Sequence, residues 1–359
     1  MRILHVINSL NIAGAERLMT GMIPVQQASG HQVELLLLND TRTTFYDQLI
    51  EKGIVIHAFH LKGGEYNPLA VWKIRKFLRN YDVVHVHLFP AQYWVAISKW
   101  LFRIKTPLVT TEHSTSNTRF NYALTTWTDR WIYRRFSFIV GITDAVTKVM
   151  EERVKHRTPV VTIENGIDIR EFSTAQPLNK VSFGLPENSR VLLMVARFRP
   201  PKNQECVIKA MALLPTDVHV LFAGDGEQIS HCQQLAEQLN VSHRVHILGI
   251  RNDIPRLYAI SDIGVVSSHW EGFGLAAVEG MAAGKPVVVS RVDGLRQIVD
   301  KDELTFDDDD EQQLAACVRK LLDNPSYYEE MSVYCQARAQ RYSIKRMAST
   351  YIDLYKKLV

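Results

Sequence analysis

The 359-residue sequence contains few cysteines, and their placement argues against both a small disulfide-rich domain and a small zinc-binding domain. The four residues stand far apart without a CxxC pair: Cys206, Cys232, Cys317 and Cys335. Such spacing suggests neither a disulfide framework nor a zinc site, and it suits a reducing compartment.

Long apolar runs are also missing. Nowhere do about 18 apolar residues follow one another, and the apolar stretch after Met1 is too short for a signal peptide. We therefore expect a cytoplasmic protein, and contact with the inner face of the cytoplasmic membrane stays open. The sequence has no metal-ligand spacing and no GxSxG, Walker or GxGxxG motif, so no metal is expected.

What is present points to an ordinary globular chain of about two domains, at ~150 residues per domain. With 46% apolar and 22% charged residues, it is neither disordered nor fibrous. Short β-branched runs alternate with helical patterns, which predicts parallel sheets covered by helices on both faces. The predicted strands are 3–7, 33–38, 83–87, 108–111, 138–142, 160–163, 190–198, 218–223, 245–248, 263–266 and 287–290.

These patterns divide the chain into two doubly wound α/β domains of the Rossmann type. We predict one over residues 1–172 and another over 173–342, followed by an amphipathic C-terminal helix at 343–359. The boundary is expected between Asp168 and Leu185, where Pro and Gly interrupt the pattern. Since open parallel sheets bind ligands at the carboxyl ends of their strands, functional motifs are expected there.

The net charge of +4 is unevenly distributed. Residues 1–172 carry 21 Lys and Arg against 15 Asp and Glu, whereas residues 173–359 carry 21 against 23. Residues 62–135 alone hold 12 cations against four acids, together with five of the six tryptophans. No nucleic-acid-binding motif accompanies this surplus, so a nucleic-acid partner is not expected.

The motif with the most chemical content is EGFGLAAVE, residues 271–279, which follows a predicted strand and opens a helix. Gly272 and Gly274 would let the backbone approach a ligand. Three backbone N–H groups would point at an anion such as a diphosphate: those of Phe273, Gly274 and Leu275. Glu271 and Glu279 would accept hydrogen bonds from hydroxyl groups. The alternative is a plain glycine-rich turn with one N-terminal acid and one solvated acid on the helix.

A second candidate is the loop ARFRPPKN at residues 196–203, after the first strand of the second half. Arg197 and Lys202 would face a diphosphate, which gains negative charge as it departs. Surface cations on a rigid proline loop are the alternative. Gly224, in the turn AGDGE, is either a plain turn residue or a further ligand contact at a strand end.

The first half has weaker candidates. Gly14 and Glu16 follow the first strand and begin a helix, while Glu112 and His113 end another strand. His113 would hydrogen-bond a sugar hydroxyl and would carry a proton near neutral pH. A simple helix N-terminus is the alternative for Gly14.

Two further histidines, His85 and His87, alternate along one predicted strand and therefore share one face of the sheet. A histidine alone on a strand is more often structural than ligating, and we favour a structural role for both.

In this order the motifs resemble those of the retaining glycosyltransferase family 4, the glycogen-synthase-like enzymes of the GT-B fold, of the type found in bacterial polysaccharide biosynthesis. The resemblance covers the whole chain: residues 13–16, 111–113, 164–168, Arg197 with Lys202, 223–227, 271–279 and 284–288. It implies two Rossmann-like domains facing across a cleft, with the last helix crossing back to the first domain. The first domain would bind the acceptor and the second the nucleotide-sugar donor.

The resemblance also implies roles for individual residues. The catalytic set would be Arg197, Lys202, Glu271 and His113. The donor would be bound by Gly14, Phe273, Gly274, Leu275, Glu279, Ile250, Arg251 and Gly224. Glu16 and Glu112 would lie on the acceptor side. The sequence departs from the family pattern at Ala13, at Ala196 and over residues 292–297, where the usual Gly-Gly-x-x-Glu is absent.

The implied reaction moves a hexose from a UDP- or GDP-linked donor to a hydroxyl of a glycan or lipid-linked acceptor, with retention and without a metal or other cofactor. Two alternatives remain: a nucleotide-sugar epimerase on the same fold, and a non-catalytic carbohydrate-binding homologue. Loops at residues 61–68 and 114–123 would select the acceptor. The basic, Trp-rich stretch would belong to the acceptor side and lie on an anionic membrane, unless its tryptophans pack in the core.

Overall fold

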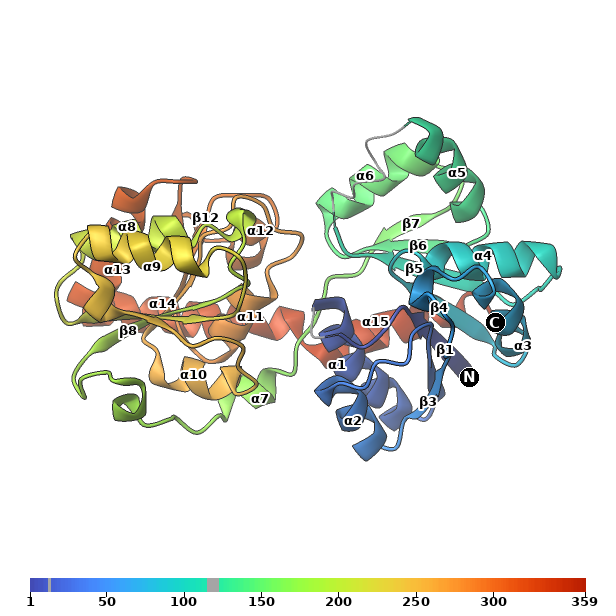
Figure 1. Cartoon of the computed structure of the whole chain (residues 1–359), viewed down its shortest axis with the longest axis horizontal. Helices are drawn as coiled ribbons and strands as arrows, with labels where there is room; N and C mark the ends of the chain where they lie inside the picture. The colour runs from blue at the N-terminus through green and yellow to red at the C-terminus, as the bar shows by residue number, and fades with distance from the viewer. Residues whose placement is uncertain (12–13, 115–122) are drawn as a thin grey trace. The chain divides into compact units, whose positions relative to one another are not determined.

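The computed structural model describes residues 1–11, 14–114 and 123–359 (Figure 1). The chain forms two compact units. The first comprises Met1–Gly166 and Ile344–Val359, and the second comprises Ile167–Ser343. Ala13, where the sequence departs from the family pattern, and most of the loop at 114–123 that is predicted to select the acceptor lie outside the described residues.

The first unit is built on a seven-stranded parallel sheet of order β3-β2-β1-β4-β5-β6-β7. Its strands are β1 Arg2–Ile7, β2 Gln32–Leu37, β3 Val55–Ala58, β4 Val83–His87, β5 Leu108–Glu112, β6 Phe138–Gly141 and β7 Val160–Thr162. β4 and β5 are buried at every position, because helices cover both faces of the sheet. The sequence prediction missed β3, which is short, lies at the sheet edge and is nowhere fully buried.

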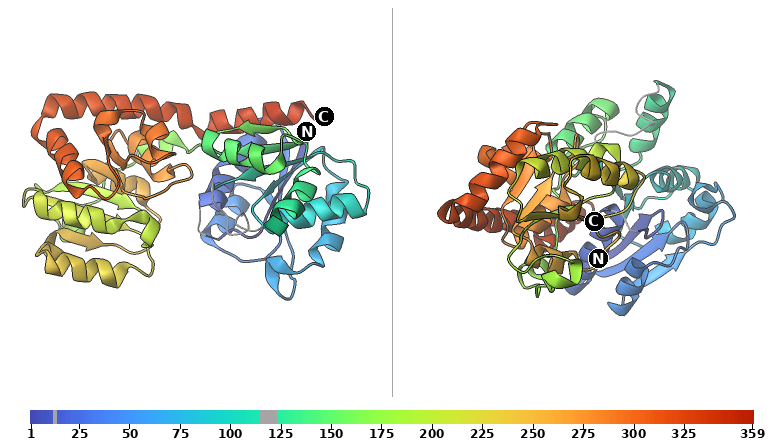
Figure 2. Two further views of the ribbon diagram at one scale, coloured as in Figure 1. Left: turned by 90° about the horizontal axis from the view of Figure 1, so that it is seen from above. Right: turned by 60° about the vertical axis from the view of Figure 1, so that its left-hand side comes forward.

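Helices α1 Gly14–Ala28, α2 Thr44–Glu51, α3 Ala70–Leu78, α4 Ala91–Leu101, α5 Ala123–Tyr133 and α6 Asp144–Val154 connect these strands. The last helix, α15 Ile344–Lys356, packs along α1 (Figure 2). Its apolar stripe includes Met347, Tyr351, Leu354 and Tyr355, all buried. The predicted return of the last helix to the first domain is confirmed.

The second unit has a six-stranded parallel sheet of order β10-β9-β8-β11-β12-β13. Its strands are β8 Arg190–Val195, β9 Val218–Ala223, β10 Val245–Ile247, β11 Ile263–Val266, β12 Val287–Ser290 and β13 Thr305–Phe306. The two-residue β13 was not predicted, because two residues show no periodicity. The predicted fold class, two Rossmann-like parallel-sheet domains, is confirmed.

Helices of the second unit are α7 Ile169–Ser173, α8 Gln204–Leu213, α9 Ile229–Gln238, α10 Ile254–Ile260, α11 Leu275–Ala282, α12 Leu295–Val299, α13 Glu311–Asp323 and α14 Pro325–Ala339. In the described part of the chain, no helix is long and apolar enough to cross a membrane.

The boundary between the units lies earlier than the predicted position after residue 172. Helix α7 packs against α10 and α11, and the ring of Phe172 lies 6.2 Å from that of Tyr258. Ile167 forms a parallel bridge with Ser343, and its N–H donates to the carbonyl of Tyr342 at 2.9 Å. These contacts hold residues 167–172 in the second unit.

Candidate active site

The sheet order of the second unit places two candidate loops side by side. β8 is the neighbour of β11, and both strands end at the same edge because they run parallel. From β8 the chain continues to β9 on one side, whereas β11 and β12 lie on the other. β8 and β11 therefore flank a topological switch point, the usual ligand position in open α/β sheets.

Lys202 and Glu271, predicted as catalytic, meet at this point. The Lys202 Nζ donates to Glu271 Oε2 at 2.5 Å, and the side chains are 28% and 21% exposed. The hydroxyl of Ser268 also donates to Glu271 Oε2, at 3.4 Å. The carboxylate is thus held by both loops while still in contact with solvent.

Backbone contacts fasten the two loops together. The Ser267 hydroxyl donates to the carbonyls of Lys202 and Asn203 at 3.1 and 2.8 Å, and the His269 N–H donates to Pro201 O at 2.9 Å. Asn203 has a φ of 52° and caps α8 by accepting a hydrogen bond from the Cys206 N–H. This turn carries Lys202 toward Glu271.

Arg197 lies in the same loop, and its side chain is exposed. Its carbonyl accepts a hydrogen bond from the Gln204 side chain at 2.9 Å. The next residue, Phe198, is fully buried and anchors the loop. The structure therefore brings Arg197, Lys202 and Glu271 to one edge of the sheet.

The backbone at Gly274 begins helix α11. Its φ of 91° is left-handed, and a Cβ there would lie 2.5 Å from Leu295 Cδ2, so the position requires glycine. The N–H groups of Leu275 and Ala276 come too early in α11 to have an acceptor within the helix, whereas the Ala277 N–H donates to Gly274 O at 3.0 Å. The Phe273 ring is buried against Tyr342, so Phe273 offers only its backbone to a ligand.

Glu279 lies in the second turn of α11 and is only 3% exposed. The alternative that it is a solvated helix residue is therefore wrong. An ionised carboxylate at this depth needs hydrogen-bond donors around it, which is compatible with binding a ligand hydroxyl.

Sequence reasoning missed Gly294, which stands within the segment that departs from the family pattern. Its φ is 89°, and a Cβ there would lie 2.5 Å from the carbonyl oxygen of Glu271. The backbone of segment 292–297 therefore packs closely against the backbone of Glu271 at Gly294. The glycine itself was the only sequence signal for this contact.

Gly224 has a structural reason to be glycine. A Cβ there would lie 1.9 Å from the carbonyl oxygen of Ala196, and the Gly224 N–H donates to Gly249 O at 2.8 Å. The turn after β9 thus packs directly on the loop that carries Arg197.

In the segment predicted to meet the base, Ile250 is 62% exposed. The Arg251 guanidinium donates twice to Asp253, at 2.8 and 2.6 Å, and this pairing lowers the pKa of the Asp253 carboxyl. The positive charge of Arg251 is therefore balanced by the carboxylate of Asp253.

A cavity of about 150 Å³ lies behind the loop of Lys202, lined partly by Arg199, Asn203, His269 and Asp309. This volume is smaller than that of a typical small-molecule pocket, ~300 Å³ or more.

The predicted residues of the first unit fall in different surroundings. Gly14 is exposed at the start of α1, whereas Glu16 is 7% exposed. Glu112 is also 7% exposed and accepts hydrogen bonds from the Gln92 side chain at 2.7 Å and from the Tyr133 hydroxyl. Both acids are thus buried rather than facing solvent on an acceptor surface.

The prediction that His113 carries a proton near neutral pH is wrong. Burial lowers the pKa of His113 to about 4, so the imidazole is neutral. Its Nε2 atom is buried and has no hydrogen-bond partner among the described residues.

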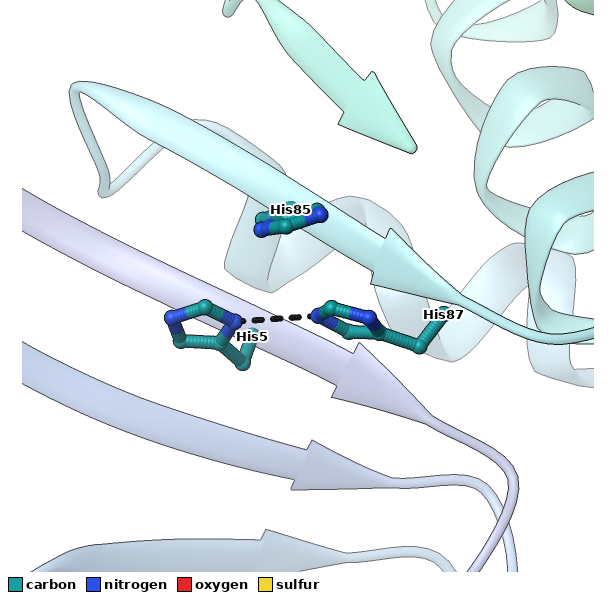
Figure 3. Close-up of side chains that lie close together, drawn as sticks. All are labelled: His5, His85 and His87. Atoms are coloured by element: carbon teal, nitrogen blue, oxygen red, sulfur yellow. Dashed lines mark hydrogen bonds between the residues drawn. The ribbon is translucent and has the colours of Figure 1, made fainter. Parts of the chain in front are cut away.

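His85 and His87 lie on one sheet face as predicted, and His5 from β1 joins them (Figure 3). His5 Nδ1 lies 3.2 Å from His87 Nε2, and His5 Nε2 lies 2.8 Å from Gln26 Oε1. His85 bonds the Tyr355 hydroxyl at 2.6 Å through Nδ1 and the Thr111 hydroxyl at 2.8 Å through Nε2. Sequence reasoning missed His5, since only the pairing of β1 with β4 brings it here.

Burial lowers the pKa of all three imidazoles, that of His5 to about 4. They are therefore neutral at neutral pH. Tyr355 lies on α15, so the cluster ties that helix to the sheet and has a structural role.

Two groups of side chains in the described ranges are close enough to hold a metal ion: His5 with His85 and His87, and His269 with Asp308 and Asp309. In the first group, both ring nitrogens of His5 and of His85 already lie in hydrogen bonds. In the second, His269 Nδ1 lies 2.9 Å from both oxygens of Asp308, which is the geometry of an imidazole–carboxylate pair.

Two parallel-sheet units, the second with charged and glycine-rich loops at a switch point, define the GT-B class of fold. Two families match the chain: "Glycosyltransferase Family 4" over residues 12–171 and "Glycosyl transferases group 1" over residues 175–339. The two matches together take in nearly the whole sequence. The chain therefore belongs to the family-4-type glycosyltransferases.

Similar proteins include N-acetyl-alpha-D-glucosaminyl L-malate synthase of Bacillus anthracis, 29% identical over 231 residues, which are 61% of this chain and 59% of that protein. Another is the UDP-Gal:alpha-D-GlcNAc-diphosphoundecaprenol alpha-1,3-galactosyltransferase of Escherichia coli, 35% identical over 145 residues, 38% of this chain and 37% of that protein. The chain thus spans less than two thirds of the length of either relative.

Among solved structures, HepE of Anabaena in complex with UDP-glucose superimposes with a TM-score of 0.85 at 24% identity. The match covers 99% of this chain and 100% of that one. At this identity the likeness establishes the fold.

Proposed function

We propose that the protein transfers a hexose from a UDP- or GDP-linked donor to an acceptor hydroxyl, with retention of the anomeric configuration. The observation that carries this proposal is the contact of Lys202 with Glu271 at the switch point, beside Arg197 and the N-terminus of α11. Cations and helix N–H groups suit a diphosphate, and a carboxylate suits sugar hydroxyls, so one site with all three suits a molecule that contains both a diphosphate and a sugar.

In the proposed reaction, the bond between the sugar C1 and the diphosphate oxygen breaks, and the diphosphate keeps the electron pair. The acceptor oxygen bonds to C1 on the same face, and its proton passes to a diphosphate oxygen. Arg197, Lys202 and the N–H groups at the start of α11 stabilise the developing negative charge. Since an ammonium has three donors, Lys202 can hold Glu271 and the diphosphate together.

Glu271 would accept hydrogen bonds from the sugar hydroxyls and Glu279 from the nucleotide ribose. The roles of Ile250 and Arg251 at the base, and those of Gly14 and His113 in the first unit, stay predictions. The names of the similar proteins support this class of chemistry: one acts with UDP-galactose on a lipid-linked diphosphate, and another binds UDP-glucose. We infer a glycan or lipid-linked acceptor.

Thermal stabilisation by a panel of UDP- and GDP-sugars tests the donor site directly, because a ligand that binds only the folded state raises the Tm. We expect one sugar nucleotide to stabilise the protein and Glu279→Ala to weaken the effect of the free nucleotide. If no sugar nucleotide raises the Tm of the unmodified protein, the proposed donor site is refuted.

With the donor known, NMR of the product determines the stereochemistry, and an inverted anomeric centre would refute retention. Release of an altered sugar without any acceptor would instead identify an epimerase. Because protein cations already meet the diphosphate charge, we expect full turnover in a chelator. Loss of turnover that a divalent ion restores would contradict metal independence.

A further inference from the structure

One surface of the first unit exposes tryptophans to an unusual extent. Trp72, Trp100 and Trp127 are 53%, 53% and 68% exposed, and Leu101 beside Trp100 is 46% exposed. Folded proteins rarely leave several large apolar side chains in water on neighbouring elements unless the surface binds something. Helices α3, α4 and α5, which carry these residues, pack in succession, α3 on α4 and α4 on α5.

The side chains of α3 and the end of α4 form one continuous surface. The Trp72 ring contacts that of Phe102 at 5.0 Å, and the Arg75 guanidinium lies 5.1 Å from the first ring and 5.0 Å from the second. Arg79 donates to the Phe102 carbonyl at 3.3 Å. Aromatic rings and guanidinium groups therefore alternate across the junction.

The same arrangement continues onto α5. Trp100 contacts Trp131 edge to face at 5.2 Å, and the Arg135 guanidinium lies 4.5 Å from the Trp131 ring. Trp127 stands one helical turn before Trp131 and so shares its side of the helix. We call the surface formed by these residues of α3, α4 and α5 the basic aromatic face.

The charge of this face has one sign. Exposed cations on α3, and in the segments that directly follow α3, α4 and α5, are Lys73, Lys76, Arg79, Arg103, Lys105 and Arg134. Among the described residues from 70 to 135, no acid is exposed: Glu112 and Asp129 are buried, and Asp82 is half-buried and accepts from the Arg2 N–H at 2.7 Å. Asp129 is also paired with Arg153 at 2.5 Å.

We propose that the basic aromatic face binds an anionic lipid surface. Tryptophan prefers the boundary between lipid headgroups and acyl chains, and lysine and arginine are attracted to anionic headgroups. A second copy of the same face is disfavoured, because two surfaces of like charge repel each other. The proposal does not depend on the glycosyl transfer proposed above, since none of these residues belongs to the candidate active site.

Co-sedimentation with vesicles tests the proposal. We expect the full chain to pellet with vesicles of phosphatidylcholine containing about one third phosphatidylglycerol, and at least ~10-fold more weakly with phosphatidylcholine alone. Binding should fall as salt is raised, because ions screen the attraction. No binding to the anionic vesicles at low salt, or equal binding to both kinds, would overturn the proposal.

Matched variants locate the surface. Lys76→Glu, Lys105→Glu and Arg134→Glu combined should weaken anionic binding by at least ~10-fold. The control combines Lys209→Glu, Arg319→Glu and Lys320→Glu, which reverse three exposed cations on α8 and α13 of the second unit, and it should bind nearly as well as the unmodified protein. An equal loss in both triple variants would show that net charge alone acts, and would overturn the assignment to this face.

The tryptophans are tested in the same way. Trp72→Ser, Trp100→Ser and Trp127→Ser combined should weaken binding at least ~10-fold, whereas Trp270→Ser removes an equally exposed tryptophan of the second unit and should not. Circular dichroism checks that each variant folds, and a misfolded triple variant is replaced by the three single ones. If the tryptophan variants instead convert a dimer to a monomer, or if the face binds RNA but not vesicles, the lipid assignment is overturned.

Discussion

The two units use the same sheet architecture but place their polar residues differently. In the second unit, Lys202 and Glu271 lie in loops at the carboxyl ends of strands and keep contact with solvent. In the first, His5, His85 and Glu112 lie inside the core, where they bond other protein groups. Lys202 and Glu271 are therefore available to a ligand, whereas His5, His85 and Glu112 stabilise the fold.

The largest expected effect concerns the buried histidines of the first unit. The pKa values of His5 and His113 lie at about 4 in the folded protein, against 6.5 for an unperturbed histidine. The unfolded state therefore binds more protons as the pH falls, and the free energy of unfolding falls with it. Protonation of the fully buried His5 should cost about 3 kcal/mol by pH 4, beginning below pH 6.5, and the half-buried His113 should cost less.

Urea unfolding between about pH 7 and pH 4, with hydrogen exchange to follow each unit, measures this loss. His5→Gln should flatten the pH dependence, whereas His156→Gln, at an exposed histidine of the same unit, should not. A first unit that is as stable at the lower pH as at the higher one would contradict the structural role of the cluster.

Gly224→Ala should be the next most damaging change, because its Cβ would overlap the Ala196 carbonyl at 1.9 Å. We expect a loss of at least ~3 kcal/mol in the free energy of unfolding. Gly249→Ala is the control: its φ is 68°, but nothing lies within 4 Å, so only the left-handed backbone strain of ~1 kcal/mol applies. Similar losses in the two variants would show that the close approach of the two loops is unimportant.

Lys202→Ala should lower kcat by ~100-fold or more, equivalent to about 3 kcal/mol, if the ammonium stabilises the departing diphosphate. The Tm of the variant should change little, since the side chain is partly exposed. Lys209→Ala, on the neighbouring helix α8, supplies the control and should keep normal turnover. A near-normal kcat in Lys202→Ala would remove this residue from the mechanism.

The smallest expected effect tests how α15 is fastened. Tyr355→Phe removes the hydrogen bond to His85 at 2.6 Å and leaves a buried ring nitrogen unpaired, which should cost ~1 to 2 kcal/mol in denaturant unfolding. Tyr66→Phe is the control: residue Tyr66 is 61% exposed, so loss of its hydroxyl should change the free energy of unfolding by less than ~0.5 kcal/mol. If both variants unfold alike, the hydroxyl of Tyr355 contributes nothing.

Much of the second unit could be predicted, because its functional residues follow buried strands closely along the chain. Arg197 and Lys202 come after β8, and Glu271 comes after β11, so the sequence order indicated the same sheet edge. The pairing of Lys202 with Glu271 could not be predicted, since it depends on β8 and β11 being neighbours in space. The support of Glu271 by Gly294 arises from packing of the same kind.

The first unit shows where such prediction fails. Glu112 was assigned to an acceptor surface, but the hydroxyl of Tyr133 and the amide of Gln92 hold it in the core. His113 was expected to titrate near neutral pH, and its burial lowers its pKa to about 4. Burial and partners come from other strands and helices, so neither is visible in the local sequence.

The sequence by itself determined the alternation of strands and helices, the two parallel-sheet units and the order of the glycine and charged motifs. It did so because a strand buried on both faces reads as an apolar run, and because a turn near a ligand needs glycine. Only the tertiary structure decided which polar residues meet: His5 with His87, Lys202 with Glu271, and α15 with the first sheet. Those contacts depend on strand order and helix packing, which join residues far apart along the chain.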